Sequence, residues 1–534
     1  MKPSNTPQFM QLPTFDGIVP SELSADYILP DTYPDVKKIL RARARPVLIG
    51  RYISGRKLEF SCAVDYIVIF SADGEGGESL HCVHFAGDFE STLGELDELD
   101  NANIVLTPRM SALNVRLSNP RKLSIRSTVS TDVKISSMLP CTAKCEGART
   151  LEEELSLERL CDTVTSGRER TFTAEPLRIS ENLEPDSTQP SIDEIVTCDA
   201  TIHFHEARPM YTSDDFTVSL KGDAVVTCLY KSRSEAGNYR SFSRKIPISY
   251  IVGADDFRDS FTDCRPESIT AYALAVPTEI NAVVAEDNYG ERRIVELDMT
   301  ADVNVHITGG EELPITLDAY STERESECVM KDFDCHSPSK VVFANFSIGE
   351  NVTRDGLNLP EDTVIVDAAA DVSVGSVTLE RGRAVMNGNA FISCILSDNA
   401  GSFTSSDFTV PIRCEMSAPD ITEPFAYNCL PSVSDLRVRI DPERISFDFE
   451  VSLCTELFER SRRHVVDTIR LIGETRSTSN DSAMTLCYPS KDETLWQIAK
   501  RYNTTVSALE AANRENSRVL LVPSAMPHTF VIDA

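Results

Sequence analysis

One sequence pattern occurs three times along this chain of 534 residues. The copies begin at Pro34 (YPDVKKILRARARPVL), Pro190 (QPSIDEIVTCDATIHF) and Pro360 (LPEDTVIVDAAADVSV). Apolar or small residues recur, without gaps, at the fifth, sixth, tenth and fourteenth positions after the proline: Ile39, Ile195 and Ile365; Leu40, Val196 and Val366; Ala44, Ala200 and Ala370; Leu48, Phe204 and Val374. A long internal repeat predicts several similar units rather than one continuous core.

In each copy, further segments alternate apolar residues with small or polar ones. The segments are RKLEFSCAVDYIVIF, DDFTVSLKGDAVVTCLY and GRAVMNGNAFISCIL, and each is followed by a loop and another strand-like run. Period two over this length is typical of β-strands that bury one face. We therefore predict a mainly β fold, with three repeated antiparallel β domains of sandwich-like or barrel-like form.

A third landmark is an x-Pro step late in each copy: Pro108, Pro266 and Pro431. Cys264 and Cys429 stand at the place that Leu106 occupies in the first copy. A cysteine that is interchangeable with leucine is expected to be a small buried hydrophobe rather than a reactive thiol. A last long strand is predicted to open at the same point of each copy: Lys122-Leu123, Arg293-Ile294 and Arg444-Ile445.

These landmarks predict the domain organisation. The expected parts are an N-terminal segment at 1–25, β domains at 26–147, 148–322 and 323–475, a small domain at 484–523 and a tail at 524–534. The stretch 151–164 (LEEELSLERLCDTV) sets leucines among acidic residues, and it is predicted to form a short helix between the first two β domains.

The charge balance restricts the expected partners. Asp and Glu total 83 against 52 Lys and Arg, which gives a formal net charge of −31. Phosphate backbones and anionic lipid surfaces repel such a chain, so we expect neither nucleic-acid binding nor membrane insertion. No signal-peptide pattern opens the chain, and its 15 cysteines include no Cys-x-x-Cys. The expected location is therefore a reducing cytosol.

Residues that could carry catalysis or hold a metal are weakly patterned. His81 and His84 are three apart on a predicted strand and so face opposite ways, whereas His203 and His205 share a face but lack further ligands. Cys141 and Cys145 have no second pair at zinc-site spacing. The glycine-rich run 74–77 is predicted to be a hairpin loop. We expect no enzyme, no metal and no cofactor.

Residues 484–523 change to a strand–helix–helix–strand pattern. Thr494 with Gln497 forms a capping-box pattern, and Asn503 can end that helix in the left-handed conformation. Thr504 or Thr505 is expected to cap the second helix, and the flanking segments are expected to pair as a two-stranded sheet. The apolar face of the first helix consists of Leu495, Ile498, Ala499 and Tyr502.

The run 492–502 (DETLWQIAKRY) resembles the core motif of the LysM family with one residue inserted, and Leu521-Val522-Pro523 matches its closing strand. This resemblance implies a βααβ domain that binds N-acetylglucosamine polymers, such as peptidoglycan, between loops 489–493 and 514–518. Both loops depart from the family's usual turns, so a protein ligand is the alternative. Trp496 is either packed in the core or a platform for a sugar ring. The candidate residues for binding a partner or a glycan are Lys491, Asp492, Thr494, Leu495, Trp496, Arg514 and Arg518.

Three repeated β units ahead of one LysM domain resemble the SPOCS-domain proteins of spore-coat morphogenesis in endospore-forming bacteria. The resemblance is carried by 29–36 (LPDTYPDV), 189–192 (QPSI) and 317–322 (LDAYST). It implies a non-enzymatic adaptor in the mother cell, which tethers coat layers to the forespore by binding the coat's morphogenetic ATPase, of the SpoIVA type, and other coat proteins. The alternative expectation is a peptidoglycan-binding protein of the cell wall.

Overall fold

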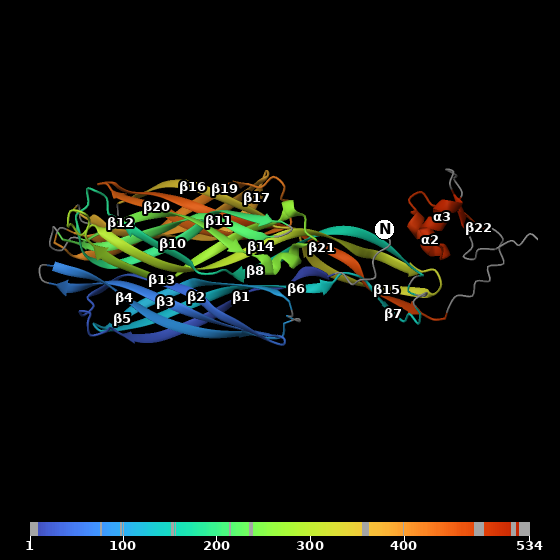
Figure 1. Cartoon of the computed structure of the whole chain (residues 1–534), viewed down its shortest axis with the longest axis horizontal. Helices are drawn as coiled ribbons and strands as arrows, with labels where there is room; N and C mark the ends of the chain where they lie inside the picture. Colours follow the sequence, from blue (N-terminus) through green and yellow to red (C-terminus); the bar gives the residue numbers. More distant parts are fainter. Residues whose placement is uncertain are drawn as a thin grey trace, which may run out of the picture.

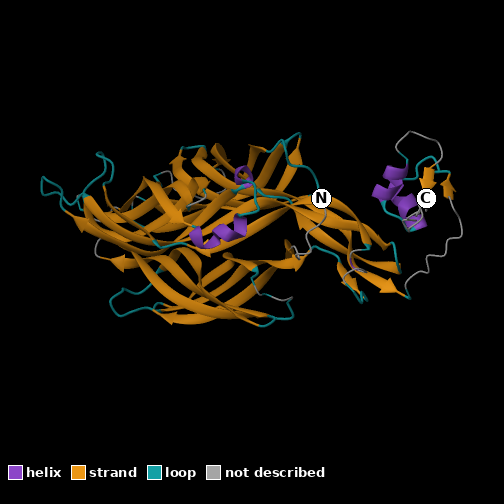
Figure 2. Ribbon diagram, turned by 45° about the vertical axis from the view of Figure 1, so that its right-hand side comes forward, coloured by secondary structure: helices purple, strands orange, loops and turns teal. Residues whose placement is uncertain are grey.

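The computed structural model describes residues 9–74, 77–96, 99, 101–150, 154, 156–212, 215–233, 239–354, 362–398, 400–474, 485–513 and 520–522. The predicted mainly β fold is confirmed, because antiparallel strands make up almost all of the body (Figure 1). Two short helices lie at the C-terminal end, beyond one end of the body (Figure 2). Within the described part of the chain, no helix combines the length and the apolar character needed to cross a bilayer.

The first six strands form two sheets. One sheet has the order β1-β6-β5 and the other has the order β2-β3-β4. The strands are β1 (Phe9–Ile28), β2 (Lys38–Ser54), β3 (Lys57–Gly74), β4 (Gly77–Leu93), β5 (Asn103–Asn119) and β6 (Lys122–Pro140). Burial along β6 alternates strictly from Leu123 to Ile135, as expected of a strand that covers a core with one face. We call these six strands unit 1.

The same order of strands returns twice. Unit 2 has the sheets β8/β9-β14-β13 and β10-β11-β12, and unit 3 has β15/β16-β21-β20 and β17-β18-β19. In both, the single first strand of unit 1 is replaced by two shorter strands that pair with different parts of one very long strand. The two sheets of each unit pack on apolar residues of that unit, which is the arrangement of a β-sandwich.

The strands of unit 2 are β8 (Leu157–Thr173), β9 (Leu177–Leu183), β10 (Ile192–Tyr211), β11 (Phe216–Ser232), β12 (Tyr239–Gly253), β13 (Thr270–Ala285) and β14 (Ile294–Ser321). Those of unit 3 are β15 (Glu325–His336), β16 (Lys340–Thr353), β17 (Val364–Glu380), β18 (Arg383–Ser397), β19 (Phe403–Ser417), β20 (Phe425–Ile440) and β21 (Arg444–Ile472). A short strand, β7 (Lys144–Glu146), follows unit 1 and pairs in parallel with β21. The predicted hairpin at 74–77 is confirmed, because Gly74 pairs with Gly77.

Two sequence-based expectations about the ends of unit 1 are wrong over part of their ranges. Residues 9–25 do not precede the first unit, because they belong to β1, which pairs with β6 from end to end. Of the helix predicted at 151–164, residues 157–164 instead begin β8, whereas Glu154 is helical and residues 151–153 and 155 lie outside the described residues. The second half of β14 supplies hydrogen-bonding partners for β8, and this long-range pairing overrides the local helical pattern of leucines and acids.

The x-Pro landmark is wrong in unit 2. Pro108 and Pro431 lie inside β5 and β20, whereas Pro266 begins the 3₁₀ helix η2 (Pro266–Ser268), ahead of β13. Unit 2 carries two extra 3₁₀ segments at this point, the other being η1 (Asp255–Phe261). Cys264 is buried as predicted, but it lies between η1 and η2 and not at the strand position of Cys429.

Candidate functional site

The C-terminal domain is built from two short strands and two short helices. Strand β22 (Thr485–Cys487) pairs with β23 (Leu520–Val522), and helices α2 (Leu495–Tyr502) and α3 (Val506–Ala512) lie between them in the chain. This is the predicted βααβ order. Its small core consists of Cys487, Ile498, Ala499, Leu509 and Val522, and one residue of the body, Tyr320, joins it.

The predicted helix caps are confirmed. The Thr494 hydroxyl accepts a hydrogen bond from the Gln497 backbone N–H at 3.3 Å, and the Gln497 side chain accepts one from the Thr494 N–H at 2.9 Å. Asn503 ends α2 with φ 51° and ψ 40°, the left-handed conformation. Thr505, rather than Thr504, caps α3. These caps satisfy backbone groups that helices this short would otherwise leave unpaired.

The first predicted binding loop is held by Glu493. Its carboxylate accepts a hydrogen bond from the Ser490 N–H at 3.1 Å and forms an ion pair with Arg501 of α2. Lys491 and Asp492 are exposed at the tip of this loop. Thr494 and Leu495 are also exposed, although the Thr494 hydroxyl is engaged in the cap. The loop therefore presents one cation and one carboxylate to solvent from a closed turn.

Two predicted site residues, Arg514 and Arg518, lie outside the residues that the structure describes. The second predicted loop, at 514–518, lies outside them as well. Lys491, Asp492, Thr494 and Leu495 lie together, exposed, at the start of α2. The side chain of Trp496, the next residue, contacts the β body instead.

Trp496 faces the β body. Its indole N–H donates a hydrogen bond to Asp318 of β14 at 2.8 Å, and its ring meets the Tyr320 ring edge-on with centroids 4.9 Å apart. Asp318 and Tyr320 are two residues apart on β14, so their side chains project from the same face of the strand. The half-buried indole is thus committed to packing and is not a free platform for a sugar ring.

Asp318 also forms an ion pair with Lys500, which lies one turn after Trp496 on α2. The Lys500 ammonium lies 2.6 and 2.8 Å from the two carboxylate oxygens. Burial alone would raise the pKa of the Asp318 carboxyl, but the hydrogen bonds from Lys500 and Trp496 outweigh it and hold that pKa below its ordinary value. The carboxylate is therefore ionised at neutral pH and binds two donors at once.

Tyr320 completes the contact. Its hydroxyl donates a hydrogen bond to the Thr504 carbonyl, between the two helices, at 2.6 Å, and only 3% of the residue is exposed. Burial raises the pKa of this hydroxyl well above its ordinary value, so it remains a donor. We call Asp318, Tyr320, Trp496, Lys500 and Thr504 the docking contact.

Sequence reasoning did not select Asp318 and Tyr320 as site residues. They stand in the run 317–322, where the pattern signals only the end of a β unit. The available signal was an acid and an aromatic residue two positions apart near the end of a long strand, beside a domain with a single tryptophan. That signal is too common to single out a pair of partners.

The other candidate residues do not form a reactive centre. His81 lies 2.9 Å from the Ser79 hydroxyl and His84 lies 3.3 Å from Asp65, so each has its own neighbour. His203 and His205 share one partner, Asp223, at 3.6 and 3.9 Å. Across the described ranges, no three His, Cys, Asp or Glu side chains are grouped so as to hold a metal ion.

Comparison with known proteins identifies the C-terminal domain. The family model described as the LysM domain matches residues 490–523. No curated protein and no solved structure matches the chain. The matched range contains the capped helices, the Glu493 loop and the closing strand. The chain therefore carries a LysM domain, of the kind that binds peptidoglycan and other N-acetylglucosamine polymers, docked on a β body.

Proposed function

We propose that this protein is a non-enzymatic adaptor of the endospore coat, of the SPOCS-domain, SipL-like type. In this proposal it acts in the mother cell and tethers the coat to the forespore surface. Its partner is the SpoIVA-type morphogenetic ATPase, together with other coat proteins, and the LysM domain is the surface that binds the ATPase.

One observation carries this proposal. The LysM domain is seated through Trp496 and Lys500 on Asp318 and Tyr320. Those two body residues lie in the run 317–322, which is part of the resemblance to SPOCS-domain proteins. Because this contact engages the indole of Trp496 with Tyr320, the domain offers no free aromatic platform for a sugar ring, which favours a protein partner over a glycan.

A second candidate function is binding to peptidoglycan, and the LysM family match favours it. The exposed start of α2, with Lys491, Asp492, Thr494 and Leu495, is where the family's first binding loop lies. Since Trp496 is committed to Tyr320, such binding would rest on hydrogen bonds from the loops rather than on stacking against the indole.

One pair of assays separates the two functions. The full chain is tested for co-purification with the coat ATPase and for pelleting with purified cell wall. The variant Lys491→Ala/Asp492→Ala changes the exposed loop tip, and Glu510→Ala, at an exposed position of α3, is the matched control. The adaptor proposal expects ATPase binding that the loop variant weakens and the control retains. Saturable pelleting with cell wall, without ATPase binding, would favour the glycan function instead.

A fluorescent fusion of the full chain, imaged in sporulating cells, tests the cellular side of the proposal. Signal surrounding the forespore is expected. Diffuse signal in vegetative cells would contradict the coat role whatever the binding assays show.

A further inference from the structure

The second sheets of the three units carry the same irregularity at the same place. The pairing of the first strand with the second skips one residue after Ile39 in β2, after Ile195 in β10 and after Ile365 in β17. The skipped residues are Leu40, Val196 and Val366. The next residues, Arg41, Thr197 and Asp367, again face corresponding partners, which are Ile69, Leu229 and Ile395. These bulges allow the units to be compared residue by residue.

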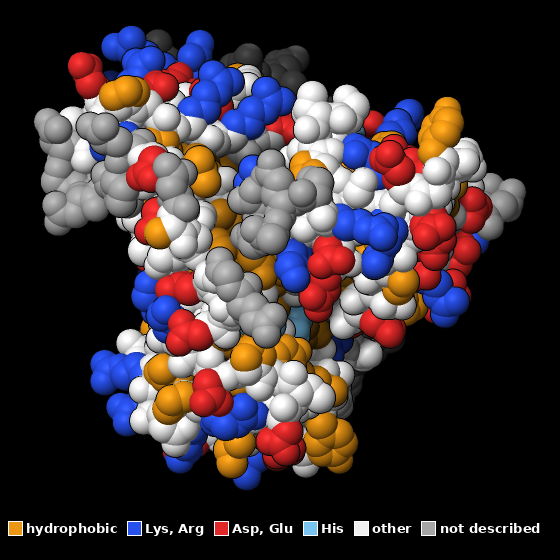
Figure 3. Space-filling model, turned by 90° about the vertical axis from the view of Figure 1, so that its left-hand side faces the viewer, with side chains coloured by type: hydrophobic (Ala, Val, Ile, Leu, Met, Phe, Trp, Pro, Cys, Tyr) orange, Lys and Arg blue, Asp and Glu red, His pale blue; other side chains and the backbone are white. Residues whose placement is uncertain are grey.

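Corresponding residues of the three units meet in one apolar cluster, which we call the axis cluster. It contains three matched sets: Leu40, Val196 and Val366; Ile69, Leu229 and Ile395; Leu80, Tyr239 and Phe403. Contacts between units follow a cycle, with β10 against β4, β17 against β12 and β2 against β18 and β19. The three sandwiches therefore surround a common axis, as three subunits of a cyclic trimer would. Seen from the end of the body, hydrophobic side chains show in the hollows between rims of mixed charge (Figure 3).

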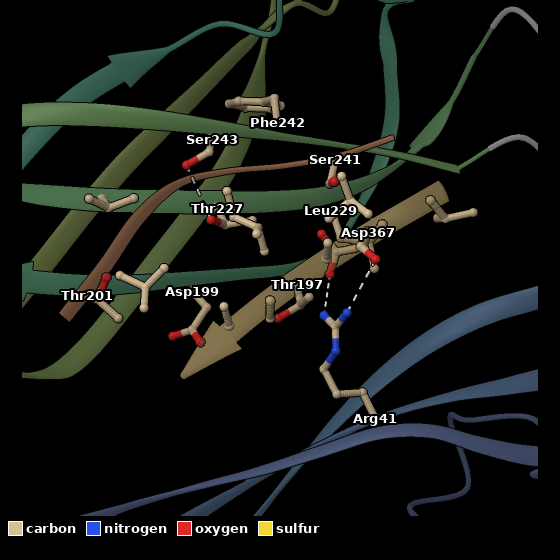
Figure 4. A pocket seen from close by; sticks show the side chains of 18 of the residues that line it. Arg41, Thr197, Asp199, Thr201, Thr227, Leu229, Ser241, Phe242, Ser243 and Asp367 are labelled. Atoms are coloured by element: carbon tan, nitrogen blue, oxygen red, sulfur yellow. Dashed lines mark hydrogen bonds and ion pairs between the residues drawn. The ribbon is translucent and has the colours of Figure 1, made fainter. Parts of the chain in front are cut away.

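Beside the axis cluster, the corresponding residues differ in charge. Arg41 of unit 1 forms a buried ion pair with Asp367 of unit 3 and donates a hydrogen bond to the Ser393 carbonyl at 2.7 Å. The third member of this set, Thr197 of unit 2, is neutral. Figure 4 shows the Arg41 guanidinium reaching from unit 1 to Asp367 across the junction.

The next alternate residues of β2 repeat this arrangement. Arg43 lies 3.1 Å from Asp199 of unit 2 and 2.9 Å from Asp371 of unit 3, and Arg45 also pairs with Asp199. Every cation in these contacts comes from unit 1, and every carboxylate comes from unit 2 or unit 3. A cavity of about 380 Å³ lies at the level of these ion pairs, lined by Arg41, Arg43, Asp199 and Asp367 among others. This layer of side chains is therefore polar and less tightly packed than the axis cluster.

A second layer of unlike charges lies in the first sheets. Lys134, His306 and Glu456 stand eleven residues after the first buried residue of β6, β14 and β21 (134 − 123, 306 − 295, 456 − 445). They line one cavity, and the His306 ring nitrogen lies 3.3 Å from the Glu456 carboxylate. Here too, one corresponding position carries different charges in the three units.

We propose that these differences in charge fix the order of the units around the axis. Three identical units would place like charges together at each layer, and like charges at such distances repel strongly where water is scarce. With arginines on unit 1 and carboxylates on units 2 and 3, only one cyclic order pairs every charge. The apolar axis cluster would hold the units together in either order, whereas the arginines of β2 favour one order over the other.

The test removes the charges and keeps the side-chain bulk. In the full chain, Arg41→Gln/Arg43→Gln/Arg45→Gln is compared with the matched control Arg413→Gln, whose arginine pairs with Glu380 and Glu415 inside unit 3. The expected result is a larger radius of gyration in X-ray scattering. Amide exchange in β2, β10 and β17 should rise by about tenfold or more, while exchange in β14 and β21 stays slow. The control should behave as wild type.

Three further outcomes decide the matter. The Arg→Lys version of the triple variant keeps the charges and is expected to restore compactness. Wild-type scattering and exchange in the Gln variant would overturn the proposal, because the apolar cluster alone would then hold the order. A uniform loss of strand signal in circular dichroism would overturn it as well, because the arginines would then support each sandwich rather than the arrangement of the units.

Discussion

The junction among the three β units and the junction between the LysM domain and β14 each centre on a carboxylate that meets a cation. Their surroundings differ. Asp367 is 4% exposed and sits between sheets of three units, beside the axis cluster. The Asp318 side chain is 30% exposed, and a single strand presents it to a single helix. The first junction is part of a core, whereas the second is a small contact at the edge of one.

This difference bears on how the parts move. If the units moved apart only slightly, each charge buried between them would have neither water nor its counter-ion. The units are therefore expected to open together or not at all. The docking contact is smaller and water reaches its partly exposed Asp318–Lys500 pair, so this contact is expected to open before the units separate. The body is thus expected to act as one rigid piece, and the LysM domain as a piece that can detach.

The largest expected effect follows from removing the buried carboxylate. Asp367→Ala leaves the Arg41 guanidinium buried without its counter-charge, which should destabilise the body by about 3–5 kcal/mol. Chemical denaturation followed by circular dichroism measures this. Asp371→Ala is the matched control, because its side chain is 71% exposed and its pair with Arg43 should contribute less than about 1 kcal/mol. Equal effects of the two substitutions would contradict the expectation that the buried pair contributes more to stability than the exposed pair.

Tyr320→Ala should act on the other junction. It removes a buried ring from the LysM core and leaves the Thr504 carbonyl without its donor, a change of about 2–4 kcal/mol in the stability of the docked domain. Amide exchange should increase in α2 and α3 but not in β10 or β17. Tyr320→Phe retains the ring, so it should recover most of the protection. Exchange that increases equally in the body would mean that the two junctions are one cooperative unit.

The two junctions are predicted to respond to pH in opposite directions. The pKa of Asp318 is lowered in the folded state, so its stabilisation is present above the unfolded value near 3.8 and is lost as pH falls through the folded pKa. For His306, burial lowers the pKa, but the adjacent Glu456 carboxylate outweighs burial and raises it above 6.5. Its contribution is therefore complete below 6.5 and is lost as pH rises through the folded pKa.

Exchange measured separately for α2 and for β14 across pH checks this. Protection in α2 should fall on acidification, and Asp318→Asn should remove that dependence. Protection around His306 should fall on going from pH 6 to pH 9, and His306→Gln should flatten the profile. Parallel profiles in the two regions would refute the assignment of opposite signs.

The smallest expected effect concerns the LysM domain by itself. Thr494→Ala removes the cap of α2 and should cost about 1 kcal/mol, felt only within that domain. Thr494→Ser keeps the hydroxyl and serves as the control. Because Thr494 is exposed and its hydroxyl is engaged within α2, the docking contact should persist, as judged by the fluorescence of Trp496, the single tryptophan.

Features that depend on neighbours in the sequence were predictable. Alternation along β6 and the capping box at Thr494 follow from local geometry, and both are present in the structure. The helix predicted at 151–164 is wrong at residues 157–164 for the complementary reason: pairing with β14, which is more than 130 residues away, overrides the local pattern there. Pro266 was misplaced because the extra 3₁₀ segments of unit 2 kept the spacing in sequence while shifting the place in the fold.

The candidate site divides in the same way. Local sequence patterns predict a mainly β chain with a repeated plan, and a LysM domain whose first loop carries Lys491 and Asp492. Only the three-dimensional arrangement shows that Trp496 faces Asp318 and Tyr320, and that Arg41 pairs with Asp367. The reason is physical. Strand alternation and helix capping depend on residues a few positions apart. Buried charges and docked rings contact their partners only when distant segments of the chain are brought together. The spacing of residues along the chain does not specify which distant segments those are.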